Sequence, residues 1–329
     1  MTTTASIKPA QAMLDLMLSG GLSELELEKL FMDFVSLPVT SELLADCAAV
    51  LRAKMLPVHL SENADIIDTC GTGGSGKRTI NTSTLTALIV ATAGGKIAKH
   101  GNRSASGNCG CFDLLEQLHV RIDLTPDMEK RIFEELGLVF LFAPAHHPSL
   151  KLVAPFRKKY GKKTIFNLFG PLCNPAGIKK QLIGTGNDQH AVLMADALFK
   201  LGSFGSKVAT GKDGLDEVTS TTETTMYAVT PSGVEKSVFS PMEVSVPYTK
   251  ESDIEGGAPE ENAAVFLKLI QGYGDTAKKN LILLNAAHAL MLAGVSPSIQ
   301  EAFTLAKETL ESGKVHNLFQ EYRELASSQ

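Results

Sequence analysis

The chain has 329 residues, a length that predicts two domains at roughly 150 residues per domain. Hydrophobic residues make up 44% and charged residues 20% of the chain, which is typical of a globular protein with a large core. The formal net charge is −5, so no global positive field is available to attract nucleic acid or acidic lipid, and we expect neither as a partner.

Cysteine usage and hydropathy together favour a cytoplasmic protein. The five cysteines are an odd number without framework spacing, as expected in a reducing compartment. The N-terminus lacks the pattern of a secretory signal, and the most apolar segments, 85–94 and 281–294, are shorter than a membrane span.

Residues 7–56 predict three short helices, with apolar stripes that include Leu14, Phe31 and Leu44. Ser23 and Ser41, each followed by acidic residues, are expected helix caps. This pattern predicts a small helical domain over residues 1–63.

From residue 64 to 329 the pattern changes to short apolar runs alternating with helical windows. Such alternation predicts an α/β domain with a mostly parallel sheet. The expected strands are 65–69, 95–98, 138–142, 181–185 and 207–210, and the expected helices are 83–93, 113–118, 126–136, 149–160 and 191–201. Residues 224–229 and 234–239 predict an antiparallel hairpin added to that sheet. The remainder, 263 to about 326, predicts helices broken at Pro297 and Gly313.

A glycine-rich turn is the most informative motif. Gly71, Gly73, Gly74 and Gly76 follow a predicted strand and precede a helix, where backbone N–H groups and the helix dipole favour an anion. A P-loop requires Ser or Thr after Lys77, and the chain has Arg there. A dinucleotide fingerprint requires an acidic residue after the next strand, which ends instead at Lys99 and His100.

A third interpretation of the turn rests on the polar residues downstream of it. Asn81, Ser83 and Thr84 lie in the first predicted helical turn, where side-chain oxygens and free N–H groups converge on a phosphate or its metal. Polar residues there are often only caps, so an ordinary strand-to-helix turn remains the alternative.

Two further segments contain groups suited to an anionic ligand. The loop expected over residues 99–107 holds Lys99, His100 and Arg103 among small residues at the end of a predicted strand, where ligands of α/β proteins bind. Asp216 and Glu217 are adjacent carboxylates, and such pairs on a loop commonly only face water. With a diphosphate as ligand, however, they match the carboxylates that Mg²⁺ needs besides substrate oxygens.

The segment after residue 145 contains one residue suited to a carboxylate ligand. Arg157 has the planar fork that binds a carboxylate through two hydrogen bonds. His146 and His147 have no third ligand at metal-site spacing, so zinc is not expected. Cys109 and Cys111 have no partner cysteines and are interpreted as small loop residues.

Taken together, these segments resemble the anthranilate phosphoribosyltransferases over nearly the whole chain. The resemblance is strongest in 71–74, 81–84, 99–106, 142–157, 164–167, 170–175 and 216–217. It implies a nucleoside phosphorylase/phosphoribosyltransferase type of fold, with a small helical domain that residues 148–162 rejoin in space. It also implies an active site between the two domains and a homodimer formed through the small domains.

The resemblance further implies an activity and a set of site residues. Family members transfer the 5-phosphoribosyl group of phosphoribosyl pyrophosphate to the amino group of anthranilate, in tryptophan biosynthesis. Magnesium would be held by Ser83, Asp216 and Glu217, and anthranilate by Gly71, Asn102 and Arg157. Lys99, His100 and Arg157 would take part in catalysis, with His100 as a candidate proton acceptor. The phosphoribosyl pyrophosphate contacts would be Gly71, Gly74, Ser75, Thr79, Asn81, Thr82, Ser83, Thr84, Lys99, His100, Gly101, Asn102, Arg103, Ser104, Ala105, Ser106, Gly107 and Cys111.

The chain departs from the family pattern at several of these motifs. Ser75 stands where Asp is usual, Cys109 or Cys111 and Phe112 replace small residues, and Lys163 replaces Arg. Two alternatives accompany the prediction. A pyrimidine nucleoside phosphorylase has a related fold with a similar Thr-Gly-Gly turn and would not need the paired carboxylates. A non-catalytic homologue that binds phosphoribosyl pyrophosphate or a nucleotide is favoured by Ser75 and Cys111.

Overall fold

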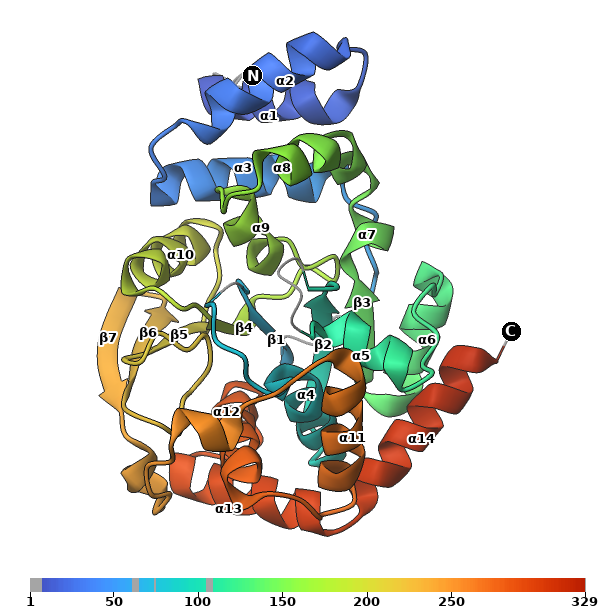
Figure 1. The fold of residues 1–329 in the computed structure, drawn as a ribbon, viewed down its shortest axis with the longest axis vertical. Helices are drawn as coiled ribbons and strands as arrows, with labels where there is room; N and C mark the ends of the chain where they lie inside the picture. The colour runs from blue at the N-terminus through green and yellow to red at the C-terminus, as the bar shows by residue number, and fades with distance from the viewer. Residues whose placement is uncertain (1–7, 61–64, 74, 105–108, 329) are drawn as a thin grey trace.

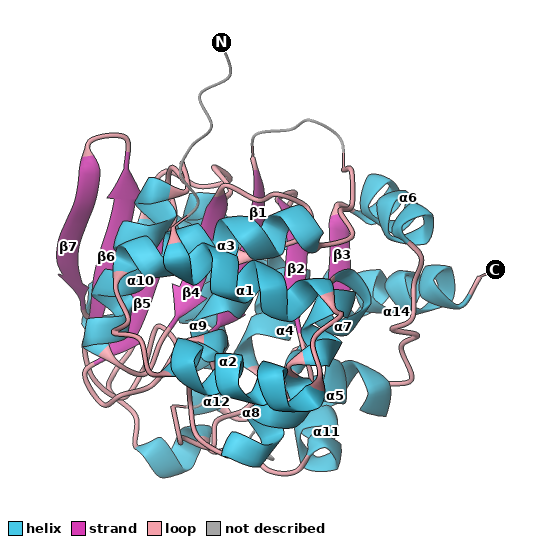
Figure 2. Cartoon of the chain, turned by 90° about the horizontal axis from the view of Figure 1, so that it is seen from above, coloured by secondary structure: helices cyan, strands magenta, loops and turns pink. Residues whose placement is uncertain are grey.

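The computed structural model describes residues 8–60, 65–73, 75–104 and 109–328. Its centre is a seven-stranded sheet in the order β3-β2-β1-β4-β5-β6-β7, seen side by side in Figure 2. The first five strands in that order are parallel, and β6 and β7 are added antiparallel. The strands are β1 (Ile66–Gly71), β2 (Lys96–Gly101), β3 (Leu138–Phe142), β4 (Lys180–Gly184), β5 (Lys207–Gly211), β6 (Thr224–Thr230) and β7 (Gly233–Phe239). The predicted α/β class, with its mostly parallel sheet and added hairpin, is confirmed.

Three helices begin the chain and lie at one end of the molecule (Figure 1). They are α1 (Pro9–Ser19), α2 (Glu24–Val35) and α3 (Ser41–Lys54). Ser23 caps α2 as expected, since its Oγ accepts from the Glu26 N–H and its own N–H donates to the Glu26 carboxylate at 2.9 Å. The expected cap at Ser41 is wrong by one residue: Thr40 Oγ1 accepts from the Leu43 N–H at 3.1 Å, and Ser41 is already helical.

The segment after residue 147 returns to these N-terminal helices. The single helix expected over residues 149–160 is instead a 3₁₀ turn, Pro148–Leu152, followed by α8 (Ala154–Tyr160). Pro155 explains the division, because it has no N–H to donate to a preceding turn. The ring of Phe31 in α2 lies 6.1 Å from those of Phe156 and Tyr160, so α8 packs on the N-terminal helices.

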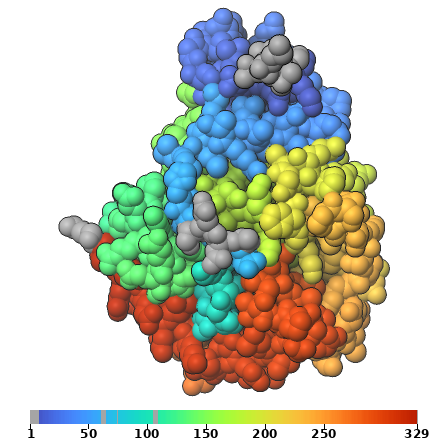
Figure 3. Space-filling view, turned by 180° about the vertical axis from the view of Figure 1, so that it is seen from behind, coloured from blue at the N-terminus to red at the C-terminus, as the bar shows by residue number. Residues whose placement is uncertain are grey.

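The predicted division into two domains stays a prediction. Figure 3 shows the N-terminal helices as a narrower end of the molecule. Their core is nevertheless continuous with the sheet, because Leu14 and Phe34 belong to the same buried cluster as Ile183 and Val208.

The remaining helices pack around the sheet. In the described part of the chain, no helix is long and apolar enough to cross a membrane. Helices α7 (Ala143–His146) and α9 (Phe166–Leu172) are short, and the sequence pattern does not predict them. The flanking helices are α4 (Thr82–Thr92), α5 (Cys111–Gln117), α6 (Pro126–Leu136), α7 (Ala143–His146), α9 (Phe166–Leu172) and α10 (Asp188–Lys200).

The C-terminal part is helical and packs against α4 and the sheet. Its helices are α11 (Pro259–Ile270), α12 (Thr276–Leu292), α13 (Ile299–Glu311) and α14 (Lys314–Ser327), after 3₁₀ turns at Pro241–Val244 and Glu251–Ile254. Pro297 and Gly313 lie between helices as expected, and a further break follows α11. Helix α4 and the part of α12 from Leu281 onward are mostly buried, which explains their lack of a polar face.

Strand β2 is longer than expected and takes in the first residues of the predicted anion loop. Lys99, His100 and Gly101 pair with Phe140, Leu141 and Phe142 of β3, so they are strand residues rather than loop residues. The sequence pattern ends the strand at residue 98 because charged side chains are unusual in a buried strand. Pairing with β1 and β3 overrides that preference.

The edge strand β3 depends on a contact from the C-terminal helix. The Phe140 N–H donates to the Tyr322 hydroxyl at 3.1 Å, and Tyr322 is 1% exposed. A buried N–H that loses its acceptor costs about 1–3 kcal/mol. We therefore expect Tyr322→Phe to lower the free energy of unfolding by about that amount in chemical denaturation.

Tyr273→Phe is the matched control. Tyr273 is 70% exposed, so the same loss of a hydroxyl should change stability by less than about 0.5 kcal/mol. Equal stabilities of the two variants would show that the Tyr322 hydroxyl does not hold the sheet edge.

Candidate active site

Four adjacent parallel strands end in glycine at one edge of the sheet: Gly71, Gly101, Gly184 and Gly211. The segment between β5 and β6 passes this edge in close contact with the ends of β4 and β1. A Cβ on Gly184 would lie 1.8 Å from the Asp216 carbonyl oxygen, and a Cβ on Gly71 would lie 3.5 Å from Asp216 Oδ2. Glycine at the end of β4 therefore allows the Asp216 carboxylate to lie beside the end of β1.

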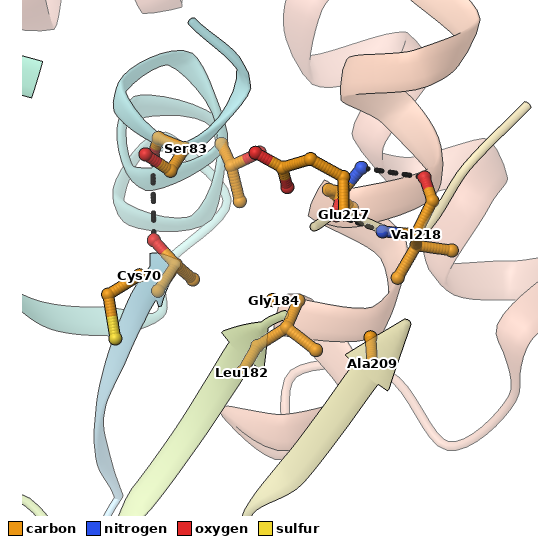
Figure 4. Close-up of a pocket in the computed structure, with 10 residues that line it drawn as sticks. Cys70, Ser83, Leu182, Gly184, Ala209, Glu217 and Val218 are labelled. Carbon is orange, nitrogen blue, oxygen red and sulfur yellow. Dashed lines mark hydrogen bonds between the residues drawn. The ribbon is translucent and has the colours of Figure 1, made fainter. Parts of the chain in front are cut away.

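Glu217, the neighbour of Asp216, lines a small cavity together with Thr69, Cys70 and Ser83. The cavity has a volume of about 10 Å³, room for about one water molecule. Figure 4 shows the Glu217 side chain reaching from its own segment toward the helix that carries Ser83. Of the three residues proposed from the sequence as magnesium ligands, the structure places Glu217 and Ser83 around one cavity and Asp216 beside the end of β1.

The carboxyl group of Glu217 is unusually basic. Burial raises its pKa to about 8, the charge of Asp216 raises it too, and the Lys99 ammonium opposes both. A cation placed between the two carboxylates would relieve their repulsion and favour the ionised form of Glu217.

The three proposed ligands fit a magnesium ion that is also bound by phosphate oxygens of a substrate. Ser83, Asp216 and Glu217 offer hard oxygen atoms, which Mg²⁺ prefers. Among the described residues, no group of three or more His, Cys, Asp or Glu side chains could hold a metal ion. Two carboxylates and a hydroxyl leave coordination positions that phosphate oxygens and water would have to fill.

The N-terminus of α4 faces the same region and is held in place by polar contacts. Asn81 caps the helix through Oδ1, which accepts from the Thr84 N–H at 3.2 Å. Its own N–H donates to Asn262 Oδ1 at 3.0 Å. Thr79 forms an isolated antiparallel bridge with Glu255, and the Thr82 hydroxyl donates to the Ile80 carbonyl. This helix start presents backbone N–H groups to an anion.

The turn that leads to α4 is only partly described. Gly73 and Gly76 have positive φ angles of 66° and 82°, where glycine is favoured. Ser75 Oγ accepts from the Lys77 N–H at 3.3 Å. Gly74 lies outside the described residues.

Lys99 lies beneath the turn rather than in a loop above it. Its side chain is 2% exposed, and Nζ donates to the Thr69 carbonyl at 2.6 Å. The ammonium is close enough to Asp68 and Glu217 to oppose the rise in the pKa of both carboxyl groups. Lys99 is therefore a buried counter-charge under the site in this structure.

His100 is the next residue of β2 and is held by two hydrogen bonds. Its N–H donates to Asp68 Oδ1, and its Nδ1 pairs with the Gly170 carbonyl, both at 3.2 Å. Burial lowers the pKa of His100 well below 6.5, and its neighbour His147, at 5.3 Å between ring centroids, lowers it further. Nε2 is buried without a hydrogen-bond partner among the described residues. The imidazole is thus neutral and weakly basic.

The remaining residues of the second predicted anion segment are mostly engaged by the protein itself. Arg103 forms a two-pronged ion pair with Glu116 at 2.7 and 2.8 Å. Asn102 Oδ1 accepts from the Arg103 N–H, and the Ser104 N–H donates to Asp113. Cys111 is buried against Gly101 at the start of α5, and burial raises the pKa of its thiol. Ala105, Ser106 and Gly107 lie outside the described residues.

Arg157 belongs to a second group of residues, on the side of the N-terminal helices. Its guanidinium carbon lies 5.3 Å from the centre of the Phe166 ring, and burial lowers its pKa. Within the described part of the chain it has no ion-pair partner. Its planar, cationic group is therefore available to a carboxylate ligand, but the contacts above do not join it to Gly71 or Asn102.

Sequence reasoning missed the buried polar residues that support this edge. Asp68 is fully buried and accepts from Asn174 at 2.9 Å and from Gln181 at 3.1 Å, in addition to His100. A charged residue inside an apolar strand was the available signal. The connection between β5 and β6, residues 212–223, carries Asp216 and Glu217 and is called the carboxylate segment. Asn285 of α12 accepts a hydrogen bond from Val218 in this segment, 67 residues earlier in the chain, and no local sequence pattern predicts that contact.

Comparisons with known proteins give the family. The model of a "Glycosyl transferase family, a/b domain" matches residues 63–316. The anthranilate phosphoribosyltransferase of Persephonella marina is 40% identical over 285 residues, which cover 86% of this chain and 84% of the relative. That of Desulfitobacterium hafniense is 39% identical over 93% of this chain and 90% of its own length.

Solved structures agree with these sequence relatives. The anthranilate phosphoribosyltransferase of Thermus thermophilus superposes with a TM-score of 0.90 at 34% identity, over 98% of this chain and 96% of that one. The enzyme of Saccharomyces cerevisiae, solved in complex with phosphoribosyl pyrophosphate and Mg, gives 0.86 at 26% identity over 97% and 92%. On this extent of similarity in sequence and in structure, the chain belongs to the anthranilate phosphoribosyltransferase family.

Proposed function

We propose that this chain transfers the 5-phosphoribosyl group of phosphoribosyl pyrophosphate to the amino nitrogen of anthranilate. The products are N-(5-phosphoribosyl)anthranilate and diphosphate. The observation that carries the proposal is the position of Asp216 and Glu217, two carboxylates beside the glycine turn and the N-terminus of α4. That arrangement suits a substrate that arrives as a magnesium diphosphate.

The diphosphate is held by N–H groups and a hydroxyl in this proposal. The turn from Gly71 to Ser75 and the first turn of α4 supply backbone N–H donors, and the Thr79 hydroxyl adds one more. Ser83, Asp216 and Glu217 would hold the magnesium ion, which would neutralise charge on the leaving diphosphate. Lys99 adds a buried positive charge beneath the site.

Positioning contributes more to this reaction than acid–base catalysis. An aniline nitrogen attacks the sugar carbon through its lone pair, so it does not need to lose a proton first. Holding both substrates in line is then the main task of the protein. His100 stays a candidate acceptor for the proton released after attack, because its Nε2 has no hydrogen-bond partner among the described residues, but its lowered pKa makes it a weak base.

Homodimer formation through the N-terminal helices and a cytoplasmic location stay predictions. Both come from the family resemblance and from composition.

One assay separates the proposal from its alternatives. Under saturating Mg²⁺, anthranilate and phosphoribosyl pyrophosphate should yield diphosphate, while thymidine and phosphate should not react. Phosphorolysis of thymidine would favour a nucleoside phosphorylase, and tight binding of phosphoribosyl pyrophosphate without turnover would favour a non-catalytic homologue. The chain has no tryptophan, so loss of anthranilate fluorescence can be followed with little protein background.

Replacing Arg157 tests the anthranilate end of the site. A charge-assisted hydrogen bond contributes about 1.5–3 kcal/mol, so Arg157→Ala should raise the KM for anthranilate by about 10- to 100-fold. The KM for phosphoribosyl pyrophosphate should change little. Lys158→Ala, which removes an exposed charge from the neighbouring position, is the control and should leave both KM values near wild type. An unchanged KM for anthranilate in Arg157→Ala would exclude this role.

The raised pKa of Glu217 predicts how magnesium binding depends on pH. Below about pH 8 the free protein holds a proton on Glu217, and a metal ion must displace that proton. The apparent affinity for Mg²⁺ should therefore rise with pH, by up to about tenfold per unit, and level off above pH 8. Glu217→Gln should bind Mg²⁺ more weakly and should lose the part of this pH dependence that the substrate phosphates do not cause. Identical pH profiles in wild type and Glu217→Gln would contradict the ligand role.

A further inference from the structure

The carboxylate segment is held from outside by one residue of the C-terminal helices. Asn285 in α12 is 3% exposed, and its amide pairs with the backbone of Val218, the residue after Glu217. Oδ1 accepts from the Val218 N–H and Nδ2 donates to the Val218 carbonyl, both at 2.9 Å. Nδ2 also donates to the Leu281 carbonyl at 2.8 Å, one turn earlier in α12. The two bonds to Val218 are drawn in Figure 4.

These bonds fix the orientation of the segment as well as its position. Hydrogen bonds to both the N–H and the carbonyl of Val218 define the position and the rotation of its backbone, as in a hydrogen-bonded residue pair between antiparallel strands. Val218 is fully buried, so its N–H and carbonyl need partners within the protein. The orientation of Val218 sets the direction of the neighbouring Glu217 side chain.

The other hydrogen bonds of the segment lie farther from Glu217. Asp213 joins Leu215 and Thr219 through its carboxylate, within the segment itself. Ser220 accepts from the Thr249 N–H at 3.0 Å and pairs with its hydroxyl at 2.8 Å, so this second attachment lies three residues after Glu217. The close approach of Asp216 to Gly184 limits how near the segment comes to β4, but a steric contact does not pull it inward. Asn285 lines the same small cavity as Glu217 and Ser83, so it attaches the segment at the cavity wall.

We propose that Asn285 is a positioning residue that holds Glu217, and with it Asp216, at the distance from Ser83 required to share a divalent cation. The inference rests on the proposed function, because it concerns the same metal ligands. Residues that orient metal ligands through hydrogen bonds typically contribute about 10- to 100-fold to metal affinity.

Binding of Mn²⁺ in place of Mg²⁺ tests the inference without turnover. With phosphoribosyl pyrophosphate present and anthranilate absent, the free Mn²⁺ signal in electron paramagnetic resonance gives the dissociation constant from the protein, after the Mn²⁺ bound by phosphoribosyl pyrophosphate alone is measured without protein and subtracted. Asn285→Ala should raise this constant by about tenfold or more. Asn285→Leu keeps the approximate size of the side chain but loses both the Oδ1 acceptor and the amide donor without adding a charge. It should also weaken Mn²⁺ binding, and it serves if Asn285→Ala does not fold.

Leu283→Ala is the matched control for destabilisation of α12. Leu283 is 3% exposed and lies two residues from Asn285, on a different face of the helix. It should lower the melting temperature while leaving the Mn²⁺ dissociation constant within about twofold of wild type. The KM for anthranilate should change little in the Asn285 variants, since Arg157 lies in another group of residues.

The outcomes separate this inference from the proposed function. If Glu217→Gln and Asp216→Asn weaken Mn²⁺ binding but neither Asn285 variant does, Asn285 is not a positioning residue and the metal ligands stand. If Leu283→Ala weakens binding as much as Asn285→Ala, the effect is general destabilisation and the inference is overturned. If the two carboxylate variants bind Mn²⁺ like wild type, the ligand assignment fails and the inference fails with it.

Discussion

The close approach of the β5–β6 segment to the ends of β1 and β4 determines how the rest of the site is arranged. Gly184 has the Asp216 carbonyl where a side chain would begin, so two carboxylates come to lie beside the glycine turn. Without that contact, Asp216 and Glu217 would lie on an ordinary exposed connection. With it, Asp216 lies beside the end of β1, and Glu217 lines a small cavity with Ser83 of α4, more than 130 residues earlier in the chain.

The same close approach of the β5–β6 segment brings the Glu217 carboxyl group near two charged groups buried in the sheet. Asp68 and Lys99 are buried in the neighbouring strands β1 and β2, and Glu217 lies close enough for Lys99 to oppose the rise in its pKa. Hydrogen bonds from Asn174, Gln181 and the His100 backbone satisfy the Asp68 carboxylate. A buried charge is tolerated only when it is paired in this way, so these polar residues form one connected network. The network lies next to the residues proposed to hold a magnesium diphosphate.

The helical layers around the sheet hold the two sides of this edge in place. Asn262 of α11 binds the backbone of Asn81 at the start of α4, and Asn285 of α12 binds that of Val218 beside the carboxylates. The C-terminal helices thus have a role beyond covering the sheet. Arg157 and its contact with Phe166 lie on the other side, where α8 packs against the N-terminal helices. A site in a cleft between these two regions stays a prediction from the family resemblance.

Local sequence patterns were enough to predict the fold class, most of the elements, and the glycine, hydroxyl and carboxylate motifs, because hydrophobic periodicity and turn chemistry are local properties. They misjudged the end of β2, since the preference of Lys99 and His100 for water is overridden by their strand partners. They also missed the breaking of the 149–160 helix and the cap at Thr40. Long-range packing places Lys99 beneath the turn, pairs Arg103 with Glu116 and attaches Asn285 to the carboxylate segment. The contacts of Lys99 and Asn285 join residues that are distant in the chain. The pairing of Arg103 depends on which of several polar partners is nearest in space. Local residue spacing does not determine either of these.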